Sequence, residues 1–241
     1  MGRGTRLLVA SLVAGTCALA GARADAQVVA GQVDDFEGLT TMGWHVGDPT
    51  HPAPPLVIAT GGPAGADDAY LRLTSLGTGE AGSRLSVLNT TRWAGNYLAA
   101  GITGISMDVR NFGTSDVFLR LLFATFPDAP GPPDNLAWSN AAVLVGANSG
   151  WTRIFFPIVQ GALFVPVGTY AGALGGAEEL RLFHNPAPFF MGPPSSSPAV
   201  AALIGIDNVT AAVAVVPEPS ALALLATGAV GLLTLRRRRA R

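Results

Sequence analysis

The residues that could do chemistry in this sequence are carboxylates, three histidines and a few aromatic side chains. The chain contains no Gly-x-Ser-x-Gly nucleophile elbow and no His-Glu-x-x-His metal motif. His45, His51 and His184 are scattered, so a zinc site would need all three or the help of carboxylates. A glycosidase needs two carboxylates about 5–10 Å apart, and the sequence singles out no such pair. We therefore predict that the protein is not an enzyme.

Aromatic side chains in two long loops could instead bind a sugar. Pro and Gly cluster at 128–139 and 185–198, which predicts loops there. Trp138 falls in the first loop, and Phe189 and Phe190 fall in the second. An exposed aromatic ring can stack on the face of a sugar ring. The alternative, which we favour for Phe189 and Phe190, is that the rings fold down over the edge of the protein.

A glycine-rich segment at 77–82 matches the phosphate-binding pattern Gly-x-Gly-x-x-Gly. A dinucleotide site also needs a helix to begin there, so that its N-terminus meets the pyrophosphate. Residues 83–88 instead have the pattern of a strand. The segment therefore predicts a glycine-rich hairpin loop without a nucleotide.

Short strands must position these side chains. In residues 105–110, three apolar residues alternate with Ser106, Asp108 and Arg110, which is the period of a half-buried strand. Nine further segments have strand character: 44–46, 56–59, 70–74, 83–88, 117–123, 141–145, 151–156, 180–183 and 203–209. Only 91–99 has the pattern of a short helix. We predict an all-β fold, a single antiparallel β-sandwich over residues 27–215, called the body below.

The N-terminal 26 residues have the three parts of a secretory signal peptide. Arg3 and Arg6 precede an uncharged run at 7–20, and a small-x-small cleavage site follows at 24–26. We predict a signal helix at 1–26, with a buried N-terminal helix as the alternative. Cleavage would remove Cys17, the only cysteine.

The C-terminal segment, 216–241, predicts a short transmembrane helix. Pro217, Glu218 and Pro219 precede fifteen uncharged residues at 221–235. Such a helix spans about 22 Å, against a hydrocarbon core of about 30 Å. Four consecutive arginines follow: Arg236, Arg237, Arg238 and Arg239. They should stay on the cytoplasmic side and leave the body outside.

Taken together, the Pro-Glu-Pro motif, the apolar span and the terminal arginines resemble the PEP-CTERM sorting signal. The resemblance implies a Gram-negative bacterium that produces exopolysaccharide or a biofilm matrix. It also implies recognition by an exosortase near Pro217–Pro219, with only transient anchoring in the inner membrane. The expected destination is the cell surface or the extracellular medium.

The body itself resembles jelly-roll domains of the carbohydrate-binding-module and galactose-binding-like type. The resemblance rests on the segments Asp-Asp-Phe-Glu-Gly at 34–38, Gly-Trp at 43–44 and Gly-Ile-Asp-Asn-Val at 205–209. It implies that the first and last strands lie near each other. It also implies a structural calcium ion held by Asp35, Glu37 and Asp207, and Ca²⁺ does prefer oxygen ligands. Alternatively, Asp34 and Asp35 are simply solvated, and Asp207 and Asn208 form a turn.

The distribution of charge along the chain limits the classes of function that the protein can have. The chain has a net charge of −1, no lysine and only 13% charged residues, against about 25% on average. Eight of its 15 arginines lie in the two end segments, so the body keeps seven arginines against fourteen acidic residues, a net charge of −7. This excludes a nucleic-acid binder. We predict an exported, non-catalytic protein with a structural or adhesive role in the matrix. The alternatives are a carbohydrate-binding module and a secreted glycan-active hydrolase.

Overall fold

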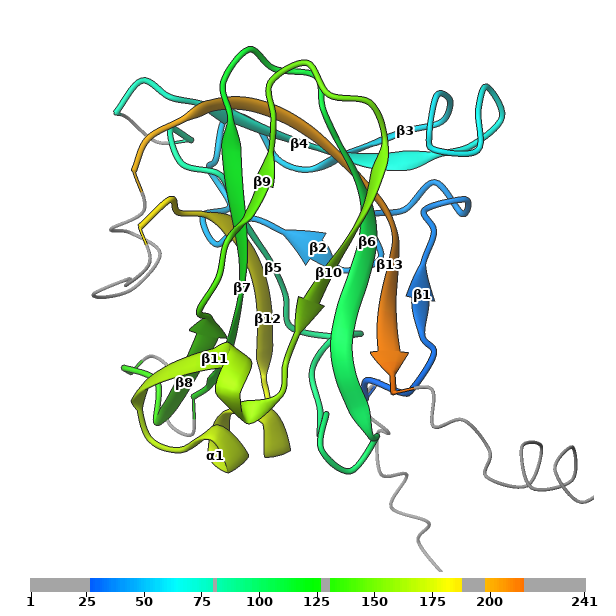
Figure 1. Cartoon of the computed structure of the whole chain (residues 1–241). Helices are drawn as coiled ribbons and strands as arrows, with labels where there is room; N and C mark the ends of the chain where they lie inside the picture. The colour runs from blue at the N-terminus through cyan, green and yellow to red at the C-terminus, as the bar shows by residue number, and fades with distance from the viewer. Residues whose placement is uncertain (1–26, 80–81, 127–130, 188–197, 215–241) are drawn as a thin grey trace, which may run out of the picture.

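Two antiparallel β-sheets pack face to face in a computed structural model that describes residues 27–79, 82–126, 131–187 and 198–214 (Figure 1). The first sheet has six strands. In spatial order these are β10 (Thr152–Pro157), β6 (Ile102–Asn111), β13 (Ala201–Val213), β4 (Tyr70–Leu76) and β3 (Leu56–Ile58), with β1 (Val33–Asp34) also paired to β13. The long strand β13 pairs with β4 and then with β1 along one side, and with β6 along the other.

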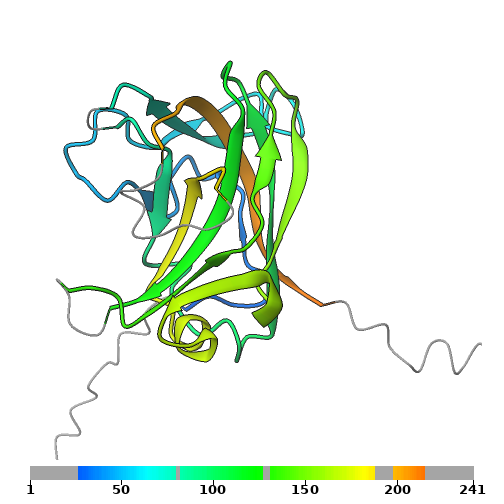
Figure 2. The same ribbon diagram turned by 60° about the vertical axis from the view of Figure 1, so that its left-hand side comes forward.

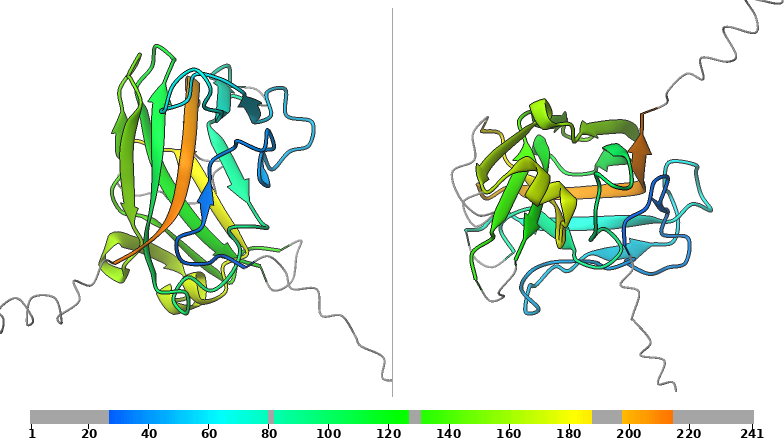
Figure 3. Two further views of the ribbon diagram at one scale, coloured as in Figure 1. Left: turned by 90° about the vertical axis from the view of Figure 1, so that its right-hand side faces the viewer. Right: turned by 90° about the horizontal axis from the view of Figure 1, so that it is seen from below.

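The second sheet has seven strands, and Figure 2 shows the two layers after a turn of 60°. In spatial order its strands are β11 (Leu163–Val167), β8 (Asn135–Ser139), β7 (Val117–Thr125), β12 (Glu179–His184), β5 (Ser86–Asn89) and β2 (Trp44–His45), with β9 (Val143–Val145) also paired to β7. The all-β sandwich predicted from the sequence is therefore confirmed. So is the proximity of the first and last strands, because β1 runs beside β13 (Figure 3).

The main core lies between the sheets, where the inward-facing residues of each strand meet. On β6 the buried residues Ile105, Met107 and Val109 alternate with the partly exposed Ser106, Asp108 and Arg110, as the period-two pattern predicts. Every predicted strand segment overlaps a strand of the structure. Burial of this apolar face fixes the register, because a slip of one residue would turn it to solvent.

A second, smaller apolar cluster lies on the other face of the second sheet. It consists of Leu122, Ala124, Leu136, Trp138 and Phe183. Strand β7 is therefore buried on both faces, which explains its nearly continuous apolar sequence.

Some local predictions were wrong. The predicted loop at 128–139 contains strand β8, the predicted helix at 91–99 is a series of turns, and the one α-helix of the described residues, α1 (Tyr170–Gly175), was not predicted. The turns form because Asn89 Oδ1 accepts hydrogen bonds from the backbone N–H groups of Thr91 and Trp93, which competes with helix formation. The segment 77–82 is not a hairpin loop, since it joins β4 of the first sheet to β5 of the second.

The predicted signal helix and transmembrane helix both lie outside the described residues. Within the described ranges, no helix has the length and apolar character needed to cross a membrane.

Candidate functional site

The three residues predicted to hold calcium are only partly brought together. Asp35 is exposed, and its Oδ1 atom accepts a hydrogen bond from the backbone N–H of Glu37 at 3.3 Å. Glu37 Oε1 accepts one from the backbone N–H of Ala69 at 2.9 Å. Asp207 is 1% exposed and lies in the middle of β13. Glu37 lies close enough to Asp207 for its negative charge to act on the Asp207 carboxyl group. Asp35, by contrast, is held in a local turn.

Asp207 is the most perturbed of the described carboxylates. Burial, followed by the negative charges of Asp68, Asp108 and Glu37, raises its pKa from 3.8 to about 7. Its partners come from the next residue, Asn208, whose backbone N–H donates to Oδ1 at 2.7 Å and whose Nδ2 donates to Oδ2 at 3.0 Å.

No pattern in the sequence indicates that Asp68 and Asp108 lie near Asp207. Asp108 lies directly opposite Asp207 in the pairing of β6 with β13, and only the strand register reveals this. The same pairing contains a bulge after Asp207, where Asn208 adopts a φ of 48°. The bulge lets Asn208 Nδ2 donate to both Asp207 and Asp108.

The fit of these carboxylates to a metal ion is incomplete. Their oxygen chemistry suits Ca²⁺. However, the described part of the chain contains no group of three or more His, Cys, Asp or Glu residues that could hold a metal ion. The predicted trio of Asp35, Glu37 and Asp207 therefore does not form a coordination site by itself. Calcium binding stays a prediction, centred on Asp207 and Glu37.

The buried carboxylate beside Asp35 has a structural role instead. Asp34 is fully buried and accepts hydrogen bonds from Trp44 Nε1 at 2.9 Å, Trp93 Nε1 at 2.7 Å and Arg92 Nε at 3.0 Å. Both indole rings are buried, with centroids 6.3 Å apart. Asp34 therefore ties β1 to the aromatic part of the core, and its charge is satisfied by three donors.

The aromatic residues predicted to bind sugars have a different setting from the one expected. Trp138 lies on β8, is 1% exposed and packs against Phe164 with ring centroids 5.3 Å apart. Its ring is thus part of the smaller apolar cluster. Phe189 and Phe190 lie outside the described residues, so their predicted role stays a prediction.

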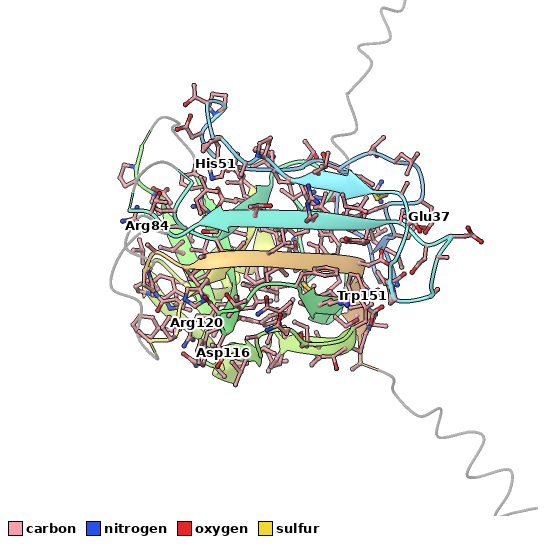
Figure 4. All side chains as sticks on the ribbon, turned by 90° about the horizontal axis from the view of Figure 1, so that it is seen from above. Glu37, His51, Arg84, Asp116, Arg120 and Trp151 are labelled. Atoms are coloured by element: carbon pink, nitrogen blue, oxygen red, sulfur yellow. The ribbon has the colours of Figure 1, made fainter. Side chains whose placement is uncertain are left out.

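A surface hollow beside β2 is a second candidate site. It has a volume of about 450 Å³, within the range of small-molecule sites. The residues lining it are Thr41, Trp44, His45, Val46, Gly47, Asp48, Pro49, His51, Pro54 and Pro55. Figure 4 shows His51 and Glu37 toward opposite ends of the sandwich, so the hollow and the carboxylates around Asp207 are separate.

The polar groups of the hollow are set by local hydrogen bonds. His45 Nδ1 lies 2.9 Å from the backbone oxygen of Gly43, an acceptor, so this nitrogen carries the proton and Nε2 is left as an acceptor. His51 Nδ1 accepts from the backbone N–H of Ala53 at 3.1 Å, so its Nε2 is a donor. Hydrogen bonds from the Thr50 side chain and backbone lower the pKa of Asp48, which keeps it ionised. These three side chains thus offer one donor and two acceptors between the proline rings of the hollow.

Residues 215–239, which follow the described part of the sandwich, match a protein-family model for the PEP-CTERM protein-sorting motif. The chain carries a PEP-CTERM sorting signal. The match covers Pro217, Glu218, Pro219 and the four consecutive arginines, which confirms the signal predicted from their order and spacing. The PEP-CTERM signal identifies the chain as an exported protein.

The body that precedes this PEP-CTERM signal is similar in fold to carbohydrate-binding modules. It is similar to a family 11 carbohydrate-binding module from Clostridium thermocellum, solved with a β-1,3-1,4-mixed-linked tetrasaccharide. The TM-score is 0.51 at 13% identity, over 78% of this chain and 98% of the module. An exo-β-agarase matches with a TM-score of 0.51 at 10% identity, over 75% of this chain but 24% of the agarase. No curated protein matches the chain in sequence.

Proposed function

We propose that the protein is an exported, non-catalytic glycan-binding protein and that the hollow beside β2 is its glycan site. The observation that carries the proposal is the arrangement of His45, Asp48 and His51 in that hollow. Sugar hydroxyls both donate and accept hydrogen bonds, so a set of one donor and two acceptors is complementary to them. The proline rings give apolar walls of fixed shape, which lowers the entropy lost on binding.

The hollow favours binding over hydrolysis. Asp48 is the one carboxylate among the described residues that line it, whereas a glycosidase needs a pair. The fold shared with a carbohydrate-binding module supports the same interpretation. We further propose a structural or adhesive role in a matrix, because binding to glycans of the matrix would hold the protein there.

We also propose a route by which the protein reaches the cell exterior. An exosortase would recognise the PEP-CTERM signal, with the C-terminal segment held transiently in the inner membrane of a Gram-negative bacterium. The protein would then reach the cell surface or an exopolysaccharide matrix. Mass spectrometry of the released protein tests this, and a released chain that still ends at Arg241 would contradict removal of the signal.

The binding test uses the full-length protein and neutral oligosaccharides, including the mixed-linked β-glucan tetrasaccharide and agarose fragments. We expect binding by calorimetry with at least one of them, weakened about tenfold by His51→Ala or Asp48→Asn, since each removes a hydrogen bond to the ligand. Asp116→Asn is the matched control. Asp116 is also exposed, and its Oδ1 also accepts a backbone N–H at 2.8 Å, but it lies away from His51 (Figure 4). Binding that neither variant of the hollow changes would overturn the assignment.

A further inference from the structure

The outer face of the first sheet carries two arginines on either side of a glycine. Gly205 of β13 lies directly opposite Arg110 of β6 on one side and Arg72 of β4 on the other. Directly paired residues share a face, so both arginine side chains leave the sheet on the same side. Their Cα atoms are two strand spacings apart, about 10 Å.

Three aromatic rings converge over Gly205. A Cβ atom at this position would lie 2.7 Å from Trp151 Cη2 and 3.0 Å from carbon atoms of both Phe112 and Tyr70. Tyr70 stacks on Phe112 with centroids 5.7 Å apart, and Trp151 meets both rings edge-on. Trp151 Nε1 donates to the backbone oxygen of Gly61 at 3.0 Å, which holds the indole in place. The rings form a fixed platform between the two arginines.

Within the described part of the chain, Arg72 and Arg110 lack the polar partners that the other arginines of the body have. Arg92, Arg153 and Arg181 form ion pairs. Arg120 donates to four backbone oxygens, and Arg84 also has a partner.

By contrast, Arg72 Nε and Arg110 Nε are buried without a hydrogen-bond partner among the described residues. Arg110 contacts the Phe112 ring, with Cζ 4.4 Å from its centroid. Both residues are partly exposed, so a ligand can reach their guanidinium groups. A buried donor without an acceptor is unfavourable, so a ligand that supplies an acceptor there is favoured.

We propose that Arg72, Arg110 and the aromatic platform bind an acidic sugar residue of a polysaccharide, through its carboxylate or sulfate group. A guanidinium group binds the paired oxygens of such anions through two parallel hydrogen bonds. Aromatic rings beside it give an apolar surface for a sugar ring. The combination of arginines and aromatic rings fits a charged sugar better than an inorganic anion, because an inorganic anion has no apolar surface to pack against the rings.

The surrounding charges favour a ligand with widely spaced negative charges. The body has a net charge of −7, and the neighbouring row of the same face carries Asp108 and Asp207 opposite each other. A continuous polyanion such as a nucleic acid would be repelled by them. A polysaccharide with one charge per sugar residue needs only one of its anions to lie between the arginines. This site lies on the other sheet from β2 and does not depend on the hollow.

The test compares charged and neutral forms of one oligosaccharide on the full-length protein. Oligogalacturonate and its methyl ester differ only in charge, and sulfated and unsulfated galactan fragments form a second pair. We expect binding of a charged form that weakens as salt is added, and at most a weaker, salt-independent binding of its neutral counterpart. The pair that shows the difference identifies carboxylate or sulfate as the ligand group.

Arg72→Gln and Arg110→Gln should each weaken that binding about tenfold, as loss of a charged hydrogen-bonding group does. Arg84→Gln is the control. It changes the net charge equally, and Figure 4 shows Arg84 at the other end of the sandwich from Trp151. Unchanged binding in both Arg72→Gln and Arg110→Gln would overturn the proposal, as would an equal loss of binding to the neutral forms in these two variants. Arginine-dependent binding of a single-stranded oligodeoxynucleotide in place of the sugars would overturn the polysaccharide assignment.

A measurement on the unmodified protein guards against variants that do not fold. The Nε–H resonances of Arg72 and Arg110 should shift on adding the charged oligosaccharide and stay in place with the neutral one. No shift in either resonance contradicts the proposal. Failure of the neutral oligosaccharides to bind at the hollow would leave this result untouched, so the two proposals can fail separately.

Discussion

Asp207→Asn should stabilise the protein at neutral pH, although it changes a buried, hydrogen-bonded residue. In the parent, the pKa of Asp207 is raised to about 7 from 3.8 by burial and by three neighbouring carboxylates. At about 1.4 kcal/mol for each pKa unit, the ionised side chain lowers the free energy of unfolding by at most about 4 kcal/mol above pH 7. Asparagine carries no charge but loses the 3.0 Å hydrogen bond from Asn208 Nδ2 to Oδ2, worth about 1 kcal/mol.

The net gain is therefore up to about 3 kcal/mol, or about 6–12 °C in Tm for a domain of this size. The gain depends on pH in a defined direction. The unfolded carboxyl group loses its proton near pH 3.8, while the folded one keeps it until about pH 7. Between these values the stability of the parent falls as pH rises, whereas asparagine does not titrate. Thermal unfolding of the parent and of Asp207→Asn at pH 4 and pH 8, with EDTA present, measures the gain in stability and its dependence on pH. A shift of equal size at the two pH values would refute the role of ionisation.

The same variant tests calcium. If Ca²⁺ binds at Asp207, added calcium raises the Tm of the parent, EDTA lowers it, and Asp207→Asn abolishes both effects, because only the folded protein binds the ion. In that case the variant is less stable than the parent in calcium and more stable in EDTA. An unchanged Tm of the parent with either reagent contradicts the calcium prediction and leaves the pH argument intact.

Three further predictions concern buried residues of the sandwich. Asp34→Ala leaves two buried indole N–H groups and the partly exposed guanidinium group of Arg92 without their acceptor, and it should lower the free energy of unfolding by about 3–5 kcal/mol in a denaturant titration, while the exposed Asp35→Ala stays within about 0.5 kcal/mol. Burial lowers the pKa of His184, so stability should fall as pH drops below about 6.5; thermal scans in the Asp207→Asn background isolate this effect, and a flat profile would contradict it. Gly205→Ala would force three aromatic rings apart and should cost about 1–3 kcal/mol, visible as a lower Tm and altered tryptophan fluorescence; an unchanged Tm would show that the rings yield freely.

The strands could be predicted where one face is buried and the other is not. Strand β6 shows this alternation clearly, and its core residues followed from it. Strand β8 does not show this alternation, because the cluster around Trp138 buries the outer face of the strand as well. The strand also follows a proline-rich segment of the sequence. The turns at 91–99 depend on the side chain of Asn89, which no periodicity reveals. A strand with one buried face can thus be inferred from the sequence, but the burial of both faces of a strand cannot.

The candidate site was predictable only to the extent that it is local. Asp207 was singled out through a resemblance, and its role as a calcium ligand stays a prediction. Asp68 and Asp108 were missed because their proximity depends on strand register and on the loop before β4. The arginines on either side of Gly205 were missed for the same reason, since 38 and 95 residues of sequence separate Arg110 from its partners in that row.

Two buried carboxylates in this sandwich illustrate how a structural residue differs from a candidate site. Asp34 is surrounded by donors, two indole N–H groups and a guanidinium group, so nothing further is needed to hold its charge. Asp207 is surrounded by carboxylates, and its own hydrogen bonds come from a single neighbouring asparagine. The first arrangement is stable by itself, whereas the second becomes favourable only when a proton or a cation arrives. The same reasoning applied to positive charge separates Arg120, which is satisfied by backbone oxygens, from Arg72 and Arg110, whose Nε atoms have no acceptor among the residues that the structure describes. In both cases, the sites open to a ligand are the charges that the fold buries without satisfying.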